Sequence, residues 1–390
     1  MRILIDAYWM SGGGTVSLRR TVSELVEAWA KEFPEDDITI VTRKKLTRRT
    51  RPTSLPDVFS SRRVMHLQSA IWPHALFAAF RAPALAKKVN AEYVLTQNFA
   101  AIFGDSFVLV HDSLFITRPE WFTLSERIYF WPMRILARRA RIVFSTTRTE
   151  GRIIAENFGI RKVVAVGLGV GEDIERFSPQ VPTRLPRAVL RSGFFLTVGR
   201  LNIRKNLVAT IESYIASDSS RNYPLVVVGD TDGKTSNLTQ ISRDAIQSGR
   251  VIFLGSISDA ELHWLYRNCR MFVFLSLGEG FGLPPAEALL LSDAPLLVSD
   301  IPVFRETLGS HARFVNPTDR NAVSSAIDSL VAEARPEVPT NSRSKMSWHG
   351  REEYVWTGVA QRIRKSICQH EYSSKHGLTT WSDESRGGLQ

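Results

Sequence analysis

Short apolar runs alternate with longer amphipathic segments in the first part of the chain. The apolar runs read, in order, RILIDA, ITIVT, YVLT, FVLVHD and RIVFST. Between the first two, apolar positions from Val16 to Lys31 recur at helical spacing. Buried strands that alternate with amphipathic helices are typical of parallel sheets with crossover helices. The pattern therefore predicts an α/β domain of the doubly wound, Rossmann-like kind.

The alternation is interrupted once and then begins again. A stretch rich in Pro, Arg and Ser, residues 177–192, breaks the pattern and predicts a linker. Beyond it follow the strand-like runs FFLTVG, PLVVVG, VIFLG, MFVFLS and APLLVS, with helix-like segments between them. We therefore predict two Rossmann-like doubly wound domains that face a cleft, over residues 1–176 and 193–345. A chain of 390 residues fits two such domains better than one.

The two ends of the chain differ in character. The first residues, MRILIDAY, predict a buried strand and have none of the three regions of a signal peptide. The chain has no uninterrupted apolar run of about 18 residues, so we expect a cytoplasmic protein without a membrane-spanning helix. Residues 346–368 predict a final helix. Residues 369–390 are rich in Ser, Gly, Thr and charge without periodicity, and predict a disordered tail.

The chain is basic, with 50 Lys and Arg against 39 Asp and Glu and a formal net charge of +11. Such a charge favours an anionic partner, which could be nucleic acid, a membrane surface or a phosphorylated substrate. No recognition motif for nucleic acid accompanies the charge, so nucleic acid is not the expected partner. Cys269 and Cys368 are too few for a disulfide framework or a zinc site.

The segment LGEGFGLPPAEALLL, residues 277–291, follows the apolar run MFVFLS. Gly280 and Gly282 let the backbone approach a ligand closely, and the two prolines after Leu283 suit the first turn of a helix. Free N–H groups and the positive end of the helix dipole make such a helix start a good diphosphate site. We therefore expect the backbone of Gly280, Phe281, Gly282 and Leu283 to bind a phosphorylated donor.

Charged side chains surround this predicted helix start. Glu279 lies on the loop, near an expected sugar, and Glu287 lies just inside the helix, where it can accept hydrogen bonds from ribose hydroxyls. In a second strand-loop-helix segment, LTVGRLNIRKNL, Arg200 and Lys205 can pair with a diphosphate and stabilise its growing charge. Arg204 lies on the same loop without a defined orientation.

Together these motifs resemble the retaining glycosyltransferases of family four, which have the GT-B fold and a signature pair of glutamates spaced as Glu279 and Glu287 are. The resemblance covers residues 1–368 as an order of elements and is specific in the C-terminal motifs. It implies that Arg200 and Lys205 hold the donor diphosphate, that Glu287 holds the ribose and that Glu279 lies beside the transferred sugar.

The resemblance also implies an activity. The expected reaction moves a hexose from a nucleoside diphosphate sugar to a glycan or lipid-linked acceptor, with retention at the anomeric carbon. Mannose on guanosine diphosphate is the favoured donor. No side-chain nucleophile is required, because in retaining members the leaving diphosphate helps to deprotonate the acceptor. No cofactor or metal is expected, because Arg200, Lys205 and a helix start already neutralise the diphosphate. The final helix is expected to cross back to the first domain, and Glu306 of VSDIPVFRETLG matches a family position.

The N-terminal half contributes two further candidates. Gly12, Gly13 and Gly14 follow the first strand, and the resemblance places Gly13 and Gly14 beside the donor phosphates. His111 ends the run FVLVHD and matches a family position near the donor sugar, where an imidazole can hydrogen-bond a hydroxyl. The candidate catalytic residues are His111, Glu279, Arg200 and Lys205.

Two alternative classes remain open at this point. A GT-B phosphorylase or sugar-nucleotide epimerase would share the fold, and a non-enzymatic nucleic-acid-binding protein would share the charge. Asp230 and Asp232 form an Asp-Thr-Asp similar to the metal-binding motif of the other glycosyltransferase fold. Short acidic turns are common, however, and two cations with a helix start already neutralise a diphosphate.

Basic and aromatic residues suggest a contact with a membrane. The region 43–63 is rich in Lys and Arg, and residues 121–141 interleave aromatic side chains with arginines. We predict that these segments rest on the anionic inner face of the cell membrane, where each cation contributes about 1 kcal/mol. Core aromatics and solvated loop charge are the alternative explanations.

Overall fold

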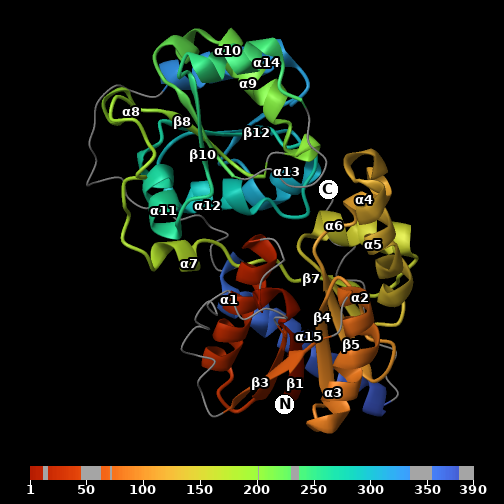
Figure 1. Ribbon diagram of the computed structural model, residues 1–390. Helices are drawn as coiled ribbons and strands as arrows, with labels where there is room; N and C mark the ends of the chain where they lie inside the picture. The colour runs from red at the N-terminus through yellow and green to blue at the C-terminus, as the bar shows by residue number, and fades with distance from the viewer. Residues whose placement is uncertain are drawn as a thin grey trace.

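The computed structural model describes residues 1–11, 16–44, 63–70, 73–200, 202–229, 237–333 and 354–376. They form two α/β domains, each with a parallel sheet between helices, and a long helix that runs along the first domain (Figure 1). The prediction of two Rossmann-like doubly wound domains is confirmed.

The N-terminal domain contains a seven-stranded sheet of order β3-β2-β1-β4-β5-β6-β7, in which all neighbours are parallel. Its strands are β1 (Arg2–Asp6), β2 (Asp37–Arg43), β3 (Val64–Ser69), β4 (Tyr93–Gln97), β5 (Asp105–Val110), β6 (Ile142–Ser145) and β7 (Val163–Ala165). Its helices are η1 (Tyr8–Ser11), α1 (Val16–Glu32), α2 (His74–Leu76), η3 (Phe77–Arg81), α3 (Ala82–Lys88), α4 (Leu114–Thr117), η4 (Pro119–Trp121), α5 (Leu124–Ala137) and α6 (Arg148–Phe158). The short helix α7 (Glu172–Glu175) lies on the connection between the domains and packs against helix α11 (Asp259–Asn268) of the second domain.

The C-terminal domain contains a six-stranded parallel sheet of order β10-β9-β8-β11-β12-β13. Its strands are β8 (Phe195–Val198), β9 (Leu225–Val228), β10 (Val251–Gly255), β11 (Met271–Phe274), β12 (Leu296–Ser299) and β13 (Arg313–Val315). Its helices are α8 (Val189–Ser192), η5 (Ile203–Lys205), α9 (Leu207–Ala216), η6 (Asp218–Arg221), α10 (Gln240–Gln247), α11 (Asp259–Asn268), α12 (Leu283–Leu291), α13 (Pro302–Leu308) and α14 (Arg320–Glu333).

Buried strands explain why the sequence reads as apolar runs. Strands β4, β6, β9, β11 and β12 are buried along their whole length, as is typical of parallel sheets covered by helices on both faces.

Several helices start at the polar residue expected of a cap. Thr123 and Ser258, for example, form reciprocal capping boxes with Glu126 and Glu261.

The last helix, α15 (Trp356–His376), returns to the N-terminal domain and lies beside α1. Its apolar face, with Val359, Ile363 and Ile367, is completely buried in the same cluster as Trp29. At the start of α15, the Trp356 ring occupies the space beside a glycine of the connection that follows β7. The last helix of the chain therefore completes the core of the first domain, although it follows the second domain in the sequence.

This helix corrects one prediction. Residues 369–376, expected to be part of a disordered tail, are helical, whereas residues 346–353 and 377–390 lie outside the described residues. The extension lacks apolar periodicity because polar groups hold it. The Tyr93 hydroxyl donates to Glu371 at 2.5 Å, and the His370 ring lies 3.1 Å from the Lys162 ammonium.

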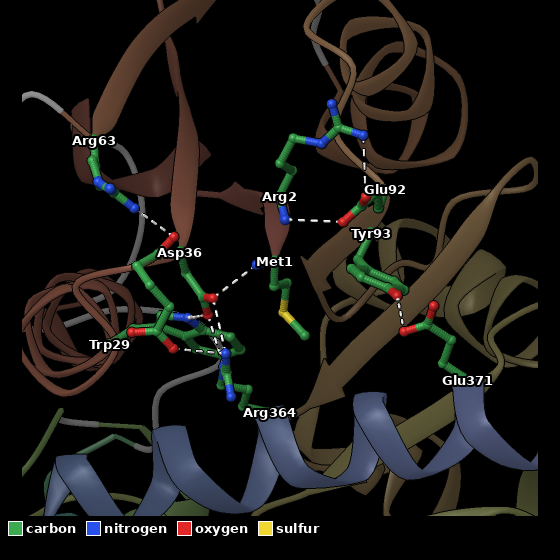
Figure 2. A network of polar contacts seen from close by, with 10 residues as sticks. Met1, Arg2, Trp29, Asp36, Arg63, Glu92, Tyr93, Arg364 and Glu371 are labelled. Carbon is green, nitrogen blue, oxygen red and sulfur yellow. Dashed lines mark hydrogen bonds and ion pairs between the residues drawn. The ribbon is translucent and has the colours of Figure 1, made fainter.

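A buried carboxylate at the base of α1 anchors α15 (Figure 2). The side chain of Asp36 is completely buried and accepts from the Nε and Nη2 atoms of Arg364 at 2.8 and 3.0 Å. It also accepts from Trp29 Nε1 at 3.0 Å and from the Met1 amino group at 2.9 Å. These donors lower the pKa of Asp36 although burial acts to raise it, so the carboxylate stays ionised and bonded.

We predict that Arg364→Ala lowers the free energy of unfolding by about 2 kcal/mol, because it leaves a buried carboxylate with fewer partners. Urea denaturation followed by circular dichroism measures the change. Lys365→Ala, an exposed position on the same helix, is the control and should change stability by less than about 0.5 kcal/mol. Equal effects of the two substitutions would show that the Asp36 contact does not anchor the helix.

Candidate functional site

The candidate site lies where the strand order reverses in each sheet. The reversal falls between β1 and β4 in the first sheet and between β8 and β11 in the second. Doubly wound sheets bind ligands beside the carboxyl ends of strands at such points. Arg200 and Lys205 follow β8, Glu279 follows β11, and His111 follows β5. Topology therefore gathers these four predicted residues on loops that face one region between the domains.

The loop after β8 presents its cations through a short capped turn. The Asn202 side chain accepts from the backbone N–H of Lys205 at 3.2 Å, and Asn206 follows in the left-handed conformation, which asparagine tolerates better than most residues. This geometry carries Lys205 back over the end of the sheet, 4.7 Å from the ring centroid of Phe274. Arg200 and Lys205 line one small pocket together.

The Glu279 carboxylate lies between two cations. One oxygen accepts from Lys205 Nζ at 2.6 Å and from the Ser276 hydroxyl at 2.6 Å, and the other accepts from Arg204 Nη1 at 2.6 Å. Arg204 also donates to the Gly278 carbonyl at 3.0 Å. Arg204, for which the sequence defined no orientation, is thus part of the site. Its position between two basic loop residues was the signal in the sequence.

These groups set each other's protonation. Burial acts to raise the pKa of Glu279, but Arg204 and Lys205 outweigh it and hold that pKa at about 2. Burial lowers the pKa of Lys205 to about 8, although Glu279 opposes the shift. Both groups are therefore charged at neutral pH. The three cations Arg200, Arg204 and Lys205 outnumber the carboxylates of Glu279 and the neighbouring Asp112, so the cluster remains positive and suits an anion.

The two domains meet at Gly280. A Cβ atom at this position would lie 2.1 Å from the His111 carbonyl oxygen, a distance that no side chain allows. The Thr146 hydroxyl donates to the carbonyls of Gly280 at 2.7 Å and of His111 at 3.2 Å. The loop that carries Glu279 therefore rests directly on the strand ends of the N-terminal domain, and the backbone contact requires glycine.

His111 is a neutral hydrogen-bonding group. Burial lowers its pKa to about 4, and its Nε2 atom lies 2.7 Å from Gln97 Oε1. With Nε2 donating to that amide oxygen, Nδ1 is left as an acceptor. Gln97 was not among the predicted residues, although a polar residue at the end of a buried strand was a readable signal.

Asp112, the residue after His111, and Glu150 of α6 are two carboxylates that interact electrostatically. Burial raises the pKa of Asp112, although Arg204 opposes this shift. Glu150 accepts from the backbone N–H of Ser113 at 2.7 Å and from its hydroxyl at 2.6 Å, and burial followed by the charge of Asp112 raises its pKa to about 7. These bonds fix the loop that positions His111.

Glu287 lies apart from the cation cluster. Its carboxylate is buried and accepts from the Tyr266 hydroxyl at 2.8 Å and from Arg20 of the N-terminal domain at 3.2 Å. Arg20 also pairs with Asp259 at the start of α11. Nothing in the sequence indicated Arg20, because its role depends on how the two domains pack.

The start of α12 has the predicted form. Gly282 has a φ of +90°, and a Cβ there would lie 2.4 Å from the Phe304 ring, so only glycine fits. Leu283 is the first helical residue. Phe281 is buried, with its ring centroid 5.3 Å from that of Tyr354, so it can reach a ligand through its backbone.

A glutamate of the second domain caps a helix of the first. Glu306 accepts from the backbone N–H groups of Arg148 and Thr149 at 2.6 and 2.8 Å. These groups are at the start of α6, where helical N–H groups lack partners within the helix. The predicted residues Gly12, Gly13, Gly14, Asp230 and Asp232 lie outside the described residues.

Comparisons with known proteins agree with this geometry. Residues 187–353 match the family model "Glycosyl transferases group 1". The chain is 28% identical over 285 residues to the O-antigen chain mannosyltransferase RfbU of Salmonella typhimurium, covering 71% of this chain and 75% of that protein. The chain is a glycosyltransferase with the GT-B fold, and its C-terminal half carries the group 1 sequence pattern.

Further relatives of the glycosyltransferase vary in length. It is 28% identical over 257 residues to the serotype-specific mannosyltransferase WbdA of Escherichia coli. This alignment covers 62% of this chain but 31% of WbdA. It is 25% identical over 260 residues to a GDP-mannose:cellobiosyl-diphosphopolyprenol alpha-mannosyltransferase of Xanthomonas oryzae pv. oryzae, covering 65% of each. The chain thus spans less than a third of one curated relative and about two thirds of the other.

A solved structure shares the fold of the glycosyltransferase. Sucrose-phosphate synthase from Thermosynechococcus elongatus superposes with a TM-score of 0.64 at 18% identity, covering 95% of this chain and 99% of that one. The family match and the mannosyltransferase relatives together support a transferase over a phosphorylase, an epimerase or a non-enzymatic nucleic-acid-binding protein. Within the described part of the glycosyltransferase, no helix is long and apolar enough to cross a membrane.

We predict that nucleoside diphosphate binding weakens as the pH rises through about 8, because Lys205 loses its proton and its charge. The affinity should fall about tenfold by the end of the transition. In Lys205→Arg the guanidinium stays charged, so the fall should be absent. Calorimetric titration with a nucleoside diphosphate at several pH values measures the affinity. If the affinity of Lys205→Arg falls with pH as it does in the wild type, the assignment is refuted.

We predict that Gly280→Ala lowers kcat/KM at least about a hundredfold, because the added methyl group separates the Glu279 loop from His111. Gly249→Ala is the control for stability. Gly249 has a φ of +74° in open space, so alanine there costs about 1 kcal/mol of stability and leaves the site intact. If both variants lose activity in proportion to their melting temperatures, the domain contact has no direct role.

Proposed function

We propose that this glycosyltransferase moves mannose from GDP-mannose to a glycan or lipid-linked acceptor, with retention of configuration at the anomeric carbon. One observation carries the proposal. Arg200, Arg204 and Lys205 gather with Glu279 beside the start of α12, at the point where two Rossmann-like sheets bind ligands. A diphosphate fits this surplus of positive charge.

The cations supply the main catalytic effect. When the bond between sugar and diphosphate breaks, negative charge grows on the diphosphate, and pre-positioned cations stabilise it without further reorganisation. Glu279 holds Arg204 and Lys205 in place through both of its oxygens. A metal ion is not needed in this scheme, because two guanidinium groups and one ammonium group provide its charge.

The protonation states support retention without a protein nucleophile. Glu279 is ionised, but both of its oxygens are engaged and its pKa of about 2 makes it a weak base. His111, with a pKa of about 4, is a weak base as well. We propose that the departing diphosphate accepts the acceptor's proton on the face from which it leaves, so that the new bond forms on the same face. His111 then hydrogen-bonds a sugar hydroxyl through Nδ1.

The ribose is assigned to Glu287. Its carboxylate lies on the same helix, α12, whose start faces the diphosphate, and Tyr266 orients one of its oxygens. Ribose hydroxyls can donate to the other oxygen, the one that Arg20 contacts.

The choices of sugar, base and acceptor rest on the relatives. The names of RfbU and WbdA describe mannosyltransferases, and that of the Xanthomonas protein specifies GDP-mannose and a diphosphopolyprenol acceptor. A lipid-linked acceptor lies at a membrane, so we propose that the enzyme works as a peripheral protein on the inner face of the cell membrane.

We predict that GDP raises the melting temperature more than UDP, ADP or CDP does. At a hundred times its dissociation constant, a ligand that binds the folded state alone stabilises it by about 2.7 kcal/mol, and a thermal-shift assay detects this readily. Equal shifts with all four nucleotides would rule out GDP as the preferred base.

The reaction itself is followed by proton NMR of the product made from GDP-mannose and a lipid-linked glycan. We expect an α-linked mannoside, and a β-linked product would contradict retention. Glu279→Gln should lower kcat/KM at least about a hundredfold, because it removes the carboxylate charge that orients Arg204 and Lys205. Glu333→Gln, an exposed glutamate of α14, is the control.

A further inference from the structure

Helix α5 exposes a continuous apolar stripe. Leu124 is 70% exposed, Ile128 66%, Trp131 64% and Ile135 46%. Their spacing of four, three and four residues places all four on one face of the helix. Single exposed apolar residues are ordinary, but a row of four along one helix marks a surface that contacts something apolar.

The opposite face of α5 is firmly packed. Met133 and Ala137 are buried. The ring of Tyr129 lies 5.5 Å from that of Phe99, and the ring of Phe130 lies 5.7 Å from that of Phe115. Most aromatic side chains of this stretch therefore belong to the core. The stripe is thus the outer face of an anchored helix and is not a displaced part of the core.

The stripe is bordered by positive charge. Arg127 and Arg134 are exposed, and the helical period places both along one edge of the stripe. Arg139, also exposed, lies in the turn that follows α5. The acidic residue of α5, Glu126, points into the capping box, where it accepts from the Thr123 backbone N–H at 2.7 Å. This face therefore presents apolar and cationic groups together, without a carboxylate of its own helix.

We propose that this face of α5 docks on an anionic lipid bilayer. An amphipathic helix with a cationic border lies in the plane of the membrane, with its apolar side chains below the headgroups and its arginines at the phosphates. Trp131 suits the headgroup level, since an indole ring combines apolar surface with a polar N–H. A second copy of the chain fits less well, because a two-fold contact would bring arginines of both copies together.

This docking deepens the proposed function, because it rests on a lipid-linked acceptor and names the surface that would bring the enzyme to it. The segment that leads from His111 to α5 contacts the donor loop directly. A Cβ at Gly278 would lie 2.9 Å from the Trp121 ring and 3.4 Å from Leu114. Figure 1 shows α4 and α5 on the side of the N-terminal domain away from α1. Docking through α5 therefore brings the donor loop, through Trp121 and Leu114, close to the lipid headgroups.

The second predicted membrane segment is described in part. Residues 45–62 of the basic region 43–63 lie outside the described residues, so its contact with lipid stays a prediction and carries no part of this proposal.

Vesicle flotation of the full chain tests the proposal. The vesicles contain phosphatidylglycerol and phosphatidylcholine, or phosphatidylcholine alone. The wild-type chain should float with the anionic vesicles and much less with the neutral ones. The double variant Ile128→Gln, Trp131→Ser should bind at least about tenfold more weakly. Arg127→Gln with Arg134→Gln should lose about fivefold per arginine on anionic vesicles alone.

Ile241→Gln is the matched control, because Ile241 is 49% exposed on α10 of the other domain, and it should float like the wild type. Circular dichroism melts and the thermal shift with GDP are measured on every variant and should not change. Failure of the GDP shift alone would overturn the proposed donor and leave the docking surface standing. Wild-type protein that floats with neither vesicle would overturn the docking surface. The docking surface would also be overturned if the stripe variants floated as well as the wild type does. It would be overturned as well if the wild type were a dimer that Ile128→Gln dissociates.

Discussion

The pairing of Glu279 with Arg204 and Lys205 is the interaction on which the rest of the site depends. These three charged side chains are largely buried. A buried charge without a partner would destabilise the folded protein. Their mutual contacts at 2.6 Å hold the loops after β8 and β11 at one separation. That separation leaves Arg200 and Lys205 around one pocket and lets the glycine after Glu279 reach the first domain. The donor site and the domain contact are therefore parts of one arrangement.

The fold was largely predictable because it follows from local pattern. Parallel strands such as β9 and β11 are buried throughout, so they read as uninterrupted apolar runs, and the residues between them keep helical spacing. Boundaries were less certain. The end of α15 is held by Tyr93 and by Lys162, and contacts between residues so distant in sequence leave no periodic signal in either segment.

The candidate site was predictable to the extent that single loops define it. Glu279, Arg200 and Lys205 could be named because strand, loop and helix start adjoin in the sequence. Arg20 and Gln97 could not be assigned in the same way. Arg20 reaches Glu287 only through domain packing, and Gln97 meets His111 because β4 and β5 lie side by side in the sheet. Such pairings arise from tertiary structure, which one sequence does not display.

The contact of Glu306 with α6 has a consequence for movement between the domains. The helix end that it satisfies consists of polar N–H groups, which water can bind almost as well as a carboxylate does. Parting the domains at this point would replace the two hydrogen bonds to Glu306 by hydrogen bonds to water. At this one contact, water can take the place of the Glu306 side chain, so the cost of separating the domains falls on the other contacts, such as those of Gly280 and of Arg20 with Glu287.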